Sequence, residues 1–213
     1  MSRPFVPFDP LADPDGFPLC LISKRTVVYS CGAIAHAGDP VRHDHPTGEL
    51  ALCRRLATAA NKVMEGESVG MGTEGSPING TEYFSPFFIT ANQTARPLTK
   101  LTEKAVRSLF GGVIRPEARI WVEPLQERGE WWASVLHDAG GDEDSDCNED
   151  QVEDYLKPWR KMIAWFSKQK DFLSTYFLMF GDGGDGGAAF PRIAVGLTRA
   201  GSLAGIIGHV VST

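Results

Sequence analysis

Two apolar segments near the end of the sequence constrain the fold more than any other feature. Residues 192–198 and 203–211 are rich in aliphatic and β-branched side chains, and the short Gly-containing segment 199–202 separates them. Two such runs on either side of a short link predict a β-hairpin. Because the second run reaches Val211, we expect the ladder hydrogen bonds of its strand to keep the end of the chain at Thr213 ordered.

Composition limits the classes of protein to which the chain can belong. Its 213 residues are 42% hydrophobic and 23% charged, which is typical of a globular protein with one sizeable core. The formal net charge of -6 argues against direct binding to a nucleic-acid backbone, but it permits binding to a protein with a basic cleft. No apolar run approaches the roughly 20 residues that cross a bilayer. We therefore expect a single soluble domain that binds neither nucleic acid nor membrane.

The cysteines indicate a reducing compartment. They stand at positions 20, 31, 53 and 147, too scattered for a disulfide framework or a CxxC metal site. The first residues also lack the pattern of a signal peptide. A cytoplasmic location is the corresponding expectation, with no cofactor and no resident metal.

The first 47 residues are expected to form an N-terminal arm followed by short strands. Five prolines within residues 1–18 exclude a helix and a central strand there, and 19–22 and 26–31 have the composition of strands. His43 and His45, with nearby carboxylates, are the most metal-like group in the chain and could hold zinc or iron. Their Pro- and Gly-rich flanks are more typical of an exposed loop.

Hydrophobic periodicity predicts the remaining elements. A helix of about 17 residues is expected from Thr47, and others from Arg96 to Leu109 and from Gln151 to Lys170. Pro158 predicts a kink or break in the last of these near Lys157. Strands are expected at 83–90 and, as a buried central strand, at 172–180, while 120–122 is either a strand or the lead into residues 131–136.

Three tryptophans lie close together in the middle of the sequence, at positions 121, 131 and 132. Trp is favoured both in well-packed cores and at interface hot spots. We expect Trp121 and at least one of the other two to belong to the core.

An acidic block runs from Asp138 to Asp154, where nine of seventeen residues are Asp or Glu. Such a block is typical of a solvated, flexible loop. A calcium loop is the sharper alternative, but the spacing and the central glycine of an EF-hand are missing. The block could also attract a basic protein partner.

The hairpin carries a family resemblance. The run from Val195 to Ile206, with the closing residues 210–213, resembles the end of the nuclease A inhibitor family. Ser212 stands where that family has Glu. A second similarity follows the first helix, where Thr73 and Glu74 match a Ser-Glu turn that leads into a Phe-rich strand, with Glu82 as a competing match. The resemblance covers residues 48–213, with 138–154 as an insertion, and leaves 1–47 without a counterpart.

The resemblance implies a single α/β (α+β) domain, a mostly antiparallel sheet sandwiched by helices and closed by the C-terminal hairpin. It also implies inhibition of a sugar-non-specific, magnesium-dependent DNA/RNA endonuclease. In that family the terminal residue and the Glu of the turn reach the nuclease active site and its metal. The matching positions are Thr213 and Glu74, or Glu82 in place of Glu74.

The sequence contains no catalytic constellation of its own. No Ser has a nucleophile-elbow context, no Cys stands beside a plausible His base, and paired carboxylates occur only in the acidic block. This favours a binding protein over an enzyme. The alternatives are a metal-dependent enzyme using His43 and His45, and an adaptor that binds its partner through residues 138–154.

Overall fold

The computed structural model describes residues 7–8, 26–29, 34–36, 47–64, 84–89, 97–109, 119–140, 148–181 and 189–211. Within these residues lie four helices: α1 (Thr47–Met64), α2 (Glu103–Leu109), α3 (Glu130–Asp138) and α4 (Glu149–Ser167). The eight strands are β1 (Pro7–Phe8), β2 (Thr26–Tyr29), β3 (Ile34–His36), β4 (Ser85–Ile89), β5 (Arg119–Pro124), β6 (Phe172–Gly181), β7 (Ala189–Thr198) and β8 (Leu203–Val211).

A five-stranded sheet with the order β4-β8-β7-β6-β5 is the centre of the fold, and every neighbouring pair in it is antiparallel. The predicted hairpin is confirmed as β7 and β8, paired from Ala189 with Val211 to Leu197 with Leu203. β6 is confirmed as a buried interior strand. The mixed α+β class expected from the sequence is therefore correct.

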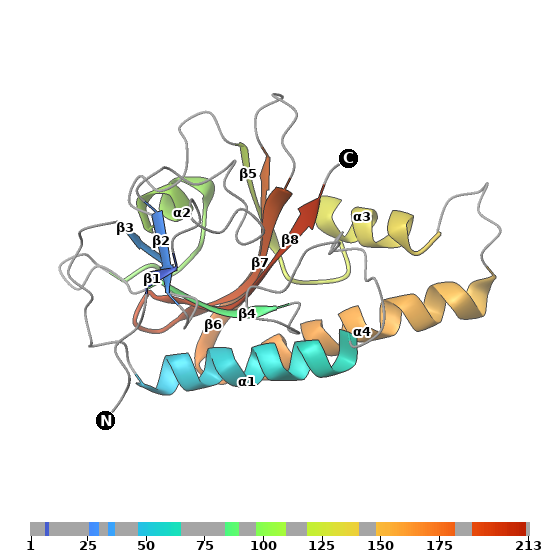
Figure 1. Cartoon of the computed structure of the whole chain (residues 1–213), viewed down its shortest axis with the longest axis horizontal. Coiled ribbons are helices and arrows are strands. Elements are labelled where there is room, and N and C mark those ends of the chain that lie inside the picture. The colour runs from blue at the N-terminus through green and yellow to red at the C-terminus, as the bar shows by residue number, and fades with distance from the viewer. Residues whose placement is uncertain are drawn as a thin grey trace.

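Alternation along the strands divides the core into two layers. Ile193, Val195 and Leu197 of β7 face one side of the sheet, where Leu101 and Val106 cover them. Ala194 faces the other side, which α1, α3 and α4 cover. Figure 1 shows the same arrangement, with α2 on its own side of the sheet and α1 beside α4. The helices thus sandwich the sheet as predicted.

The N-terminal part contributes a separate three-stranded antiparallel sheet, β1-β2-β3. β2 confirms the strand predicted at 26–31 as far as Tyr29, and residues 30–31 lie outside the described residues. Pro7 and Phe8 pair with Tyr29 and Val28, so the proline-containing strand lies at an edge, where its missing N–H costs no ladder bond. The strand expected at 19–22 lies outside the described residues.

The predicted start of α2 was wrong. The sequence favoured a helix from Arg96, but the helix begins at Glu103, because the preceding segment is held against the sheet. The Leu101 N–H donates a hydrogen bond to the Tyr176 hydroxyl (3.2 Å), and the Thr102 hydroxyl then accepts the Ala105 N–H (3.2 Å) as an N-cap.

The predicted break at Pro158 was also wrong, since α4 runs unbroken through this residue. A proline removes one helical hydrogen bond, here the one that would end on the Asp154 carbonyl. Asp154 is exposed, so water can replace the lost donor. The buried side chains of Leu156, Trp159 and Met162 hold both halves of the helix against the core.

The acidic block is not a loop over its whole length. Asp138 ends α3, and Glu149–Asp154 form the first turns of α4. Asn148 caps α4 in a capping box with Gln151, and acidic residues at a helix N-terminus interact favourably with the helix dipole. Residues 141–147 lie outside the described residues.

The tryptophan prediction needs one correction. Trp131 and Trp132 are both buried, whereas Trp121 is only half-buried at the border of the same cluster. None of the described helices is long and apolar enough to cross a membrane.

Candidate functional site

The residues that sequence reasoning assigned to a site all lie outside the described residues. This applies to Glu74, Glu82 and Thr213, and equally to His43 and His45. Within the described part of the chain, no group of three or more His, Cys, Asp or Glu side chains could hold a metal ion. The structure does describe the strands to which the segments with Glu74, Glu82 and Thr213 are attached.

Those attachment points lie at one end of the sheet. β4 runs antiparallel to β8, and its first residue, Ser85, pairs with Ile207. The chain therefore enters β4 at the same end of the sheet toward which β8 runs on to Val211 (Figure 1). The segment before Phe84 and the segment after Val211 thus leave the described fold from this end, which we call the β4/β8 end.

The start of β4 is fixed to α1. The Phe84 N–H donates to Asn61 Oδ1 (2.7 Å), and Asn61 Nδ2 donates to the Phe84 carbonyl (2.8 Å). Phe84 itself is buried on the side of the sheet that α1, α3 and α4 cover. A side-chain amide that satisfies both backbone groups of one residue holds the chain firmly where it enters the strand.

β8 extends beyond its neighbour at this end. Ile207 is the last β8 residue that pairs with β4, while Gly208–Val211 continue to pair with β7. Among the described residues, this part of β8 has a strand on one side only. Unpaired strand edges are surfaces to which another chain can add backbone hydrogen bonds.

Arg192 brings a positive charge to the β4/β8 end. It pairs across the β7–β8 ladder with Gly208, and its Nη1 donates to the Phe180 carbonyl (3.2 Å). Burial lowers the pKa of Arg192 to about 10, and the group stays cationic at neutral pH. A half-buried guanidinium therefore lies near the end of the sheet from which β8 continues.

The opposite end of the hairpin is a tight turn. The Thr198 N–H donates to the Ser202 carbonyl (2.9 Å), and the Gly201 N–H donates to the Thr198 carbonyl (2.9 Å). The Thr198 hydroxyl accepts the Ser202 N–H (3.2 Å). Gly201 has a φ of 83°, the left-handed conformation that such a turn requires and that glycine adopts most easily.

Glu49 of α1 contacts this turn. Burial raises the pKa of the Glu49 carboxyl; the Thr198 hydroxyl, which hydrogen-bonds to it, opposes the rise, and the negative charge of Asp171 adds to it. Glu49 Oε2 is inaccessible and has no hydrogen-bond partner among the described residues. The contact thus joins the start of α1 to the hairpin turn. It also leaves one oxygen of the Glu49 carboxylate buried without a hydrogen bond among the described residues, which disfavours the charged form.

We expect Glu49→Gln to stabilise the protein at neutral pH. The raised folded-state pKa means that this group favours folding below the unfolded value of 4.5 and that its contribution is lost as pH rises through the folded pKa. The amide keeps the shape without the charge. Because the side chain is only half-buried, the gain should be modest, about 0.5 kcal/mol at pH 7, and it should shrink at acid pH.

Urea unfolding at several pH values measures this effect. Glu130→Gln is the matched control, because Glu130 is also in the first turn of a helix but is exposed. It reports the loss of the helix-dipole contribution alone. A Glu49→Gln variant less stable than wild type at neutral pH would show that the ionised carboxylate is favourable where it stands.

Neither Glu49 nor Arg192 was singled out from the sequence as a site residue. The sequence placed Glu49 in the first turn of a helix and among the carboxylates near His43 and His45, but its contact with Thr198 spans far too much of the chain for a local pattern to reveal it. Arg192 did carry a signal. It shares the strand alternation of Ala194, which predicts an inward-facing charge at the start of an apolar strand.

Comparison with known proteins adds no relative, since no protein-family model and no curated protein matches this chain. The resemblance to nuclease A inhibitors remains a prediction from sequence motifs.

Proposed function

We propose that this chain is a protein-binding domain that inhibits a sugar-non-specific, magnesium-dependent DNA/RNA endonuclease. The observation that carries the proposal is the common β4/β8 end. The segment that contains Glu74 and Glu82 enters the described fold at Phe84, and the segment with Thr213 leaves it after Val211, at the same end of the sheet. Two segments joined to one end can engage a single partner site.

The chemistry of the two groups suits such a partner. Mg²⁺ prefers oxygen ligands and usually keeps several exchangeable waters in a nuclease site. A carboxylate from Glu74 and the carboxylate of Thr213 are anionic oxygen donors that resemble the phosphate oxygens of a substrate. The net charge of -6 further favours the basic cleft of an enzyme that handles nucleic acid.

The strand that leads to Thr213 supports the proposal through its rigidity. β8 pairs with β7 as far as Val211, so the strand is held by a regular ladder up to the last described residue. Ordering costs subtract directly from affinity, and a group presented on a rigid strand incurs less of them. The role is one of binding, without catalysis by this chain.

We also propose a cytoplasmic site of action. Cys53 is a buried thiol whose Sγ donates to the Phe87 carbonyl (3.1 Å), an arrangement suited to a reducing compartment.

Inhibition assays on a panel of sugar-non-specific, magnesium-dependent endonucleases test the proposal. We expect the 213-residue chain to inhibit at least one of them and a version extended by four residues after Thr213 to inhibit less. Losing one hot-spot contact of about 2 kcal/mol weakens inhibition roughly 30-fold. Glu74→Gln should weaken it similarly, with Glu82→Gln as the matched control that decides between the two carboxylates.

Each result bears on a different part of the proposal. If the extended chain inhibits as well as the original, the carboxylate of Thr213 is not a contact. If Glu82→Gln is the weaker inhibitor, the Glu assignment moves to Glu82. Absence of inhibition across the panel would overturn the proposed function.

A further inference from the structure

The solvent-facing side of α4 carries a charged stripe. Asp150, Asp154, Lys157 and Lys161 follow one another at helical spacings of three or four residues, and all four side chains are exposed. At about 100° per residue they fall within roughly 60° of the helix circumference. We call these four residues the α4 stripe. Its first half is acidic and its second half is basic.

Among the described residues, the charges of the stripe are not paired off. Asp150 and Asp154 are four residues apart, as are Lys157 and Lys161, and like charges at this spacing repel, while Asp154 and Lys157 are the one neighbouring pair of opposite charge in the stripe. No ion pair joins any of the four to another described residue. Arg160, on a neighbouring face of α4, shows the contrast, because it pairs with both Glu127 and Glu153.

The order of charges makes the stripe complementary to itself. Position 150 is as far before the midpoint of the stripe as position 161 is after it, and the same holds for 154 and 157. An antiparallel second α4 would therefore place Asp150 against Lys161 and Asp154 against Lys157, each twice. A two-fold interface has this property, since each contact occurs in two symmetric copies.

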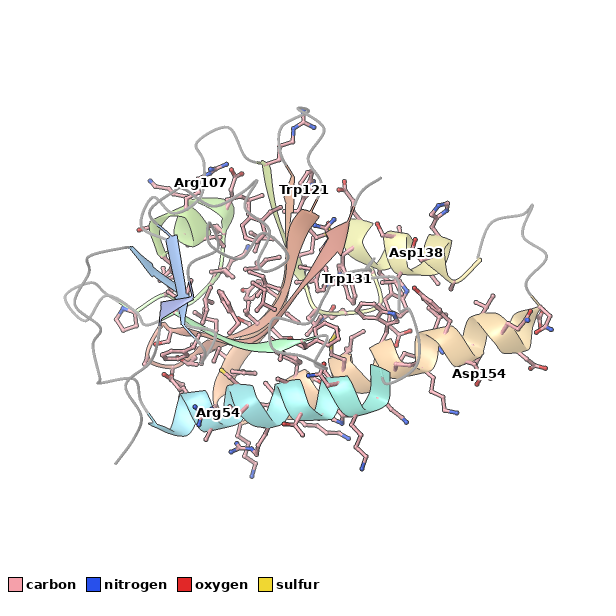
Figure 2. All side chains as sticks on the ribbon, in the orientation of Figure 1. Arg54, Arg107, Trp121, Trp131, Asp138 and Asp154 are labelled. Atoms are coloured by element: carbon pink, nitrogen blue, oxygen red, sulfur yellow. The ribbon has the colours of Figure 1, made fainter. Side chains whose placement is uncertain are left out.

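The surroundings of α4 extend this complementarity. The basic half of α4 lies beside α1, whose outer side exposes Arg54, Arg55 and Lys62. The acidic half projects past the end of α1, as Figure 2 shows for Asp154 on α4 and Arg54 on α1. The helical layer thus has a basic body and an acidic extension, and each could meet the other in a second copy.

We propose that the α4 stripe is an interface through which two copies of this chain associate about a two-fold axis. The charge distribution also favours the dipole of α4 within the monomer, but the dipole does not require the charges to share one exposed stripe with mirrored spacing. The interface is independent of the proposed nuclease inhibition.

A second copy fits this surface better than nucleic acid does. The acidic half of the stripe would repel a phosphate backbone, and the whole chain has a net charge of -6. Single strands usually stack their bases on exposed aromatic rings. The aromatic side chains of α4, at positions 155, 159, 165 and 166, are half-buried or buried.

Charge exchange between two variants tests the interface. Lys157→Glu with Lys161→Glu makes the stripe fully acidic, and Asp150→Lys with Asp154→Lys makes it fully basic. Each variant should repel its own copies, whereas a mixture of the two should form a heterodimer. Lys100→Glu with Lys104→Glu is the matched control. Both lysines are exposed, Lys104 lies in α2 and Lys100 precedes it, and the double substitution changes the net charge by the same amount as the acidic stripe variant.

Sedimentation velocity at low ionic strength measures the association, and native mass spectrometry of the mixture identifies the heterodimer. We expect wild type and the control to dimerise in about 20 mM salt and to dissociate in about 0.5 M salt, where charges are screened. Each stripe variant alone should associate at least about tenfold more weakly than wild type. Circular dichroism checks that all variants are folded.

Three outcomes would overturn the interface. The first is a wild-type chain that stays monomeric at low salt up to the highest soluble concentration. The second is dimerisation of the stripe variants as strong as that of the control. The third is a mixture of the two variants that forms no heterodimer.

Discussion

Replacing Gly205 with alanine is expected to destabilise the protein by about 3 kcal/mol or more, at the upper end of what overpacking costs. Gly205 lies in the interior of the sheet, opposite Val195 of β7 and Phe87 of β4. A Cβ on Gly205 would stand 2.0 Å from the Ala194 carbonyl oxygen and 2.8 Å from the Val195 Cα. Both are backbone atoms of the central strand, so relief requires the sheet itself to move.

Gly196→Ala is the control that separates backbone from side-chain crowding. A Cβ at Gly196 would meet the ring of Phe172, with ring carbons at 2.1 and 2.2 Å, and no backbone atom is among these contacts. Phe172→Ala should therefore remove most of the cost of Gly196→Ala and none of the cost of Gly205→Ala. Urea unfolding of the single and double variants measures both cycles.

Two results would contradict the prediction for Gly205. A change of less than about 0.5 kcal/mol, the usual range of neutral surface substitutions, would mean that β7 and β8 can separate locally without loss of the ladder. Rescue of Gly205→Ala by Phe172→Ala would likewise show that the crowding is in side chains.

Elements defined by an uninterrupted pattern were predicted correctly from the sequence. α1 buries one continuous face, while β6 and the β7–β8 hairpin are buried on both faces of the sheet, so local periodicity, apolar runs and turn residues contain the necessary information. The tight turn at Gly201 is an example, since a short link with glycine between two strands has few alternatives.

Elements decided by distant contacts were not predicted. The start of α2 depends on the hydroxyl of Tyr176, which is 75 residues from Leu101 in sequence. No local propensity contains that contact. At Pro158 the local sequence predicted a break, but packing of the buried side chains on both sides of the proline preserves the helix.

For the candidate site, the structure describes only the strands to which the predicted site segments are joined. The motifs pointed to the end of β8 and to the turn before β4, and pairing of Ser85 with Ile207 brings the two attachment points to one end of the sheet. Register between strands 122 residues apart follows from packing across the whole sheet. Charge contacts such as those of Glu49 and Arg192 depend on the same packing, which explains why the sequence alone did not reveal them.

Trp131→Ala is expected to cost about 3 to 5 kcal/mol, as other large-to-small changes of buried aromatic residues do. The Trp131 side chain is 1% exposed and stacks on Phe177 with ring centroids 4.6 Å apart. It also contacts Trp132 edge-on at 5.4 Å, and its Nε1 donates to the Pro124 carbonyl at 3.1 Å. Alanine would remove these contacts and leave a cavity between α3, α4 and the sheet.

Two further variants show which part of the side chain matters. Trp131→Phe keeps an aromatic ring on Phe177 but loses the Nε1 hydrogen bond, and we expect it to cost clearly less than Trp131→Ala, about 1 to 2 kcal/mol. Trp121→Ala is the control at a half-buried tryptophan and should cost less than Trp131→Ala, because less buried area is lost there. Urea unfolding followed by circular dichroism measures all three. An equal cost for Trp121→Ala and Trp131→Ala would place the centre of the aromatic cluster at the edge strand β5 and not beneath α3.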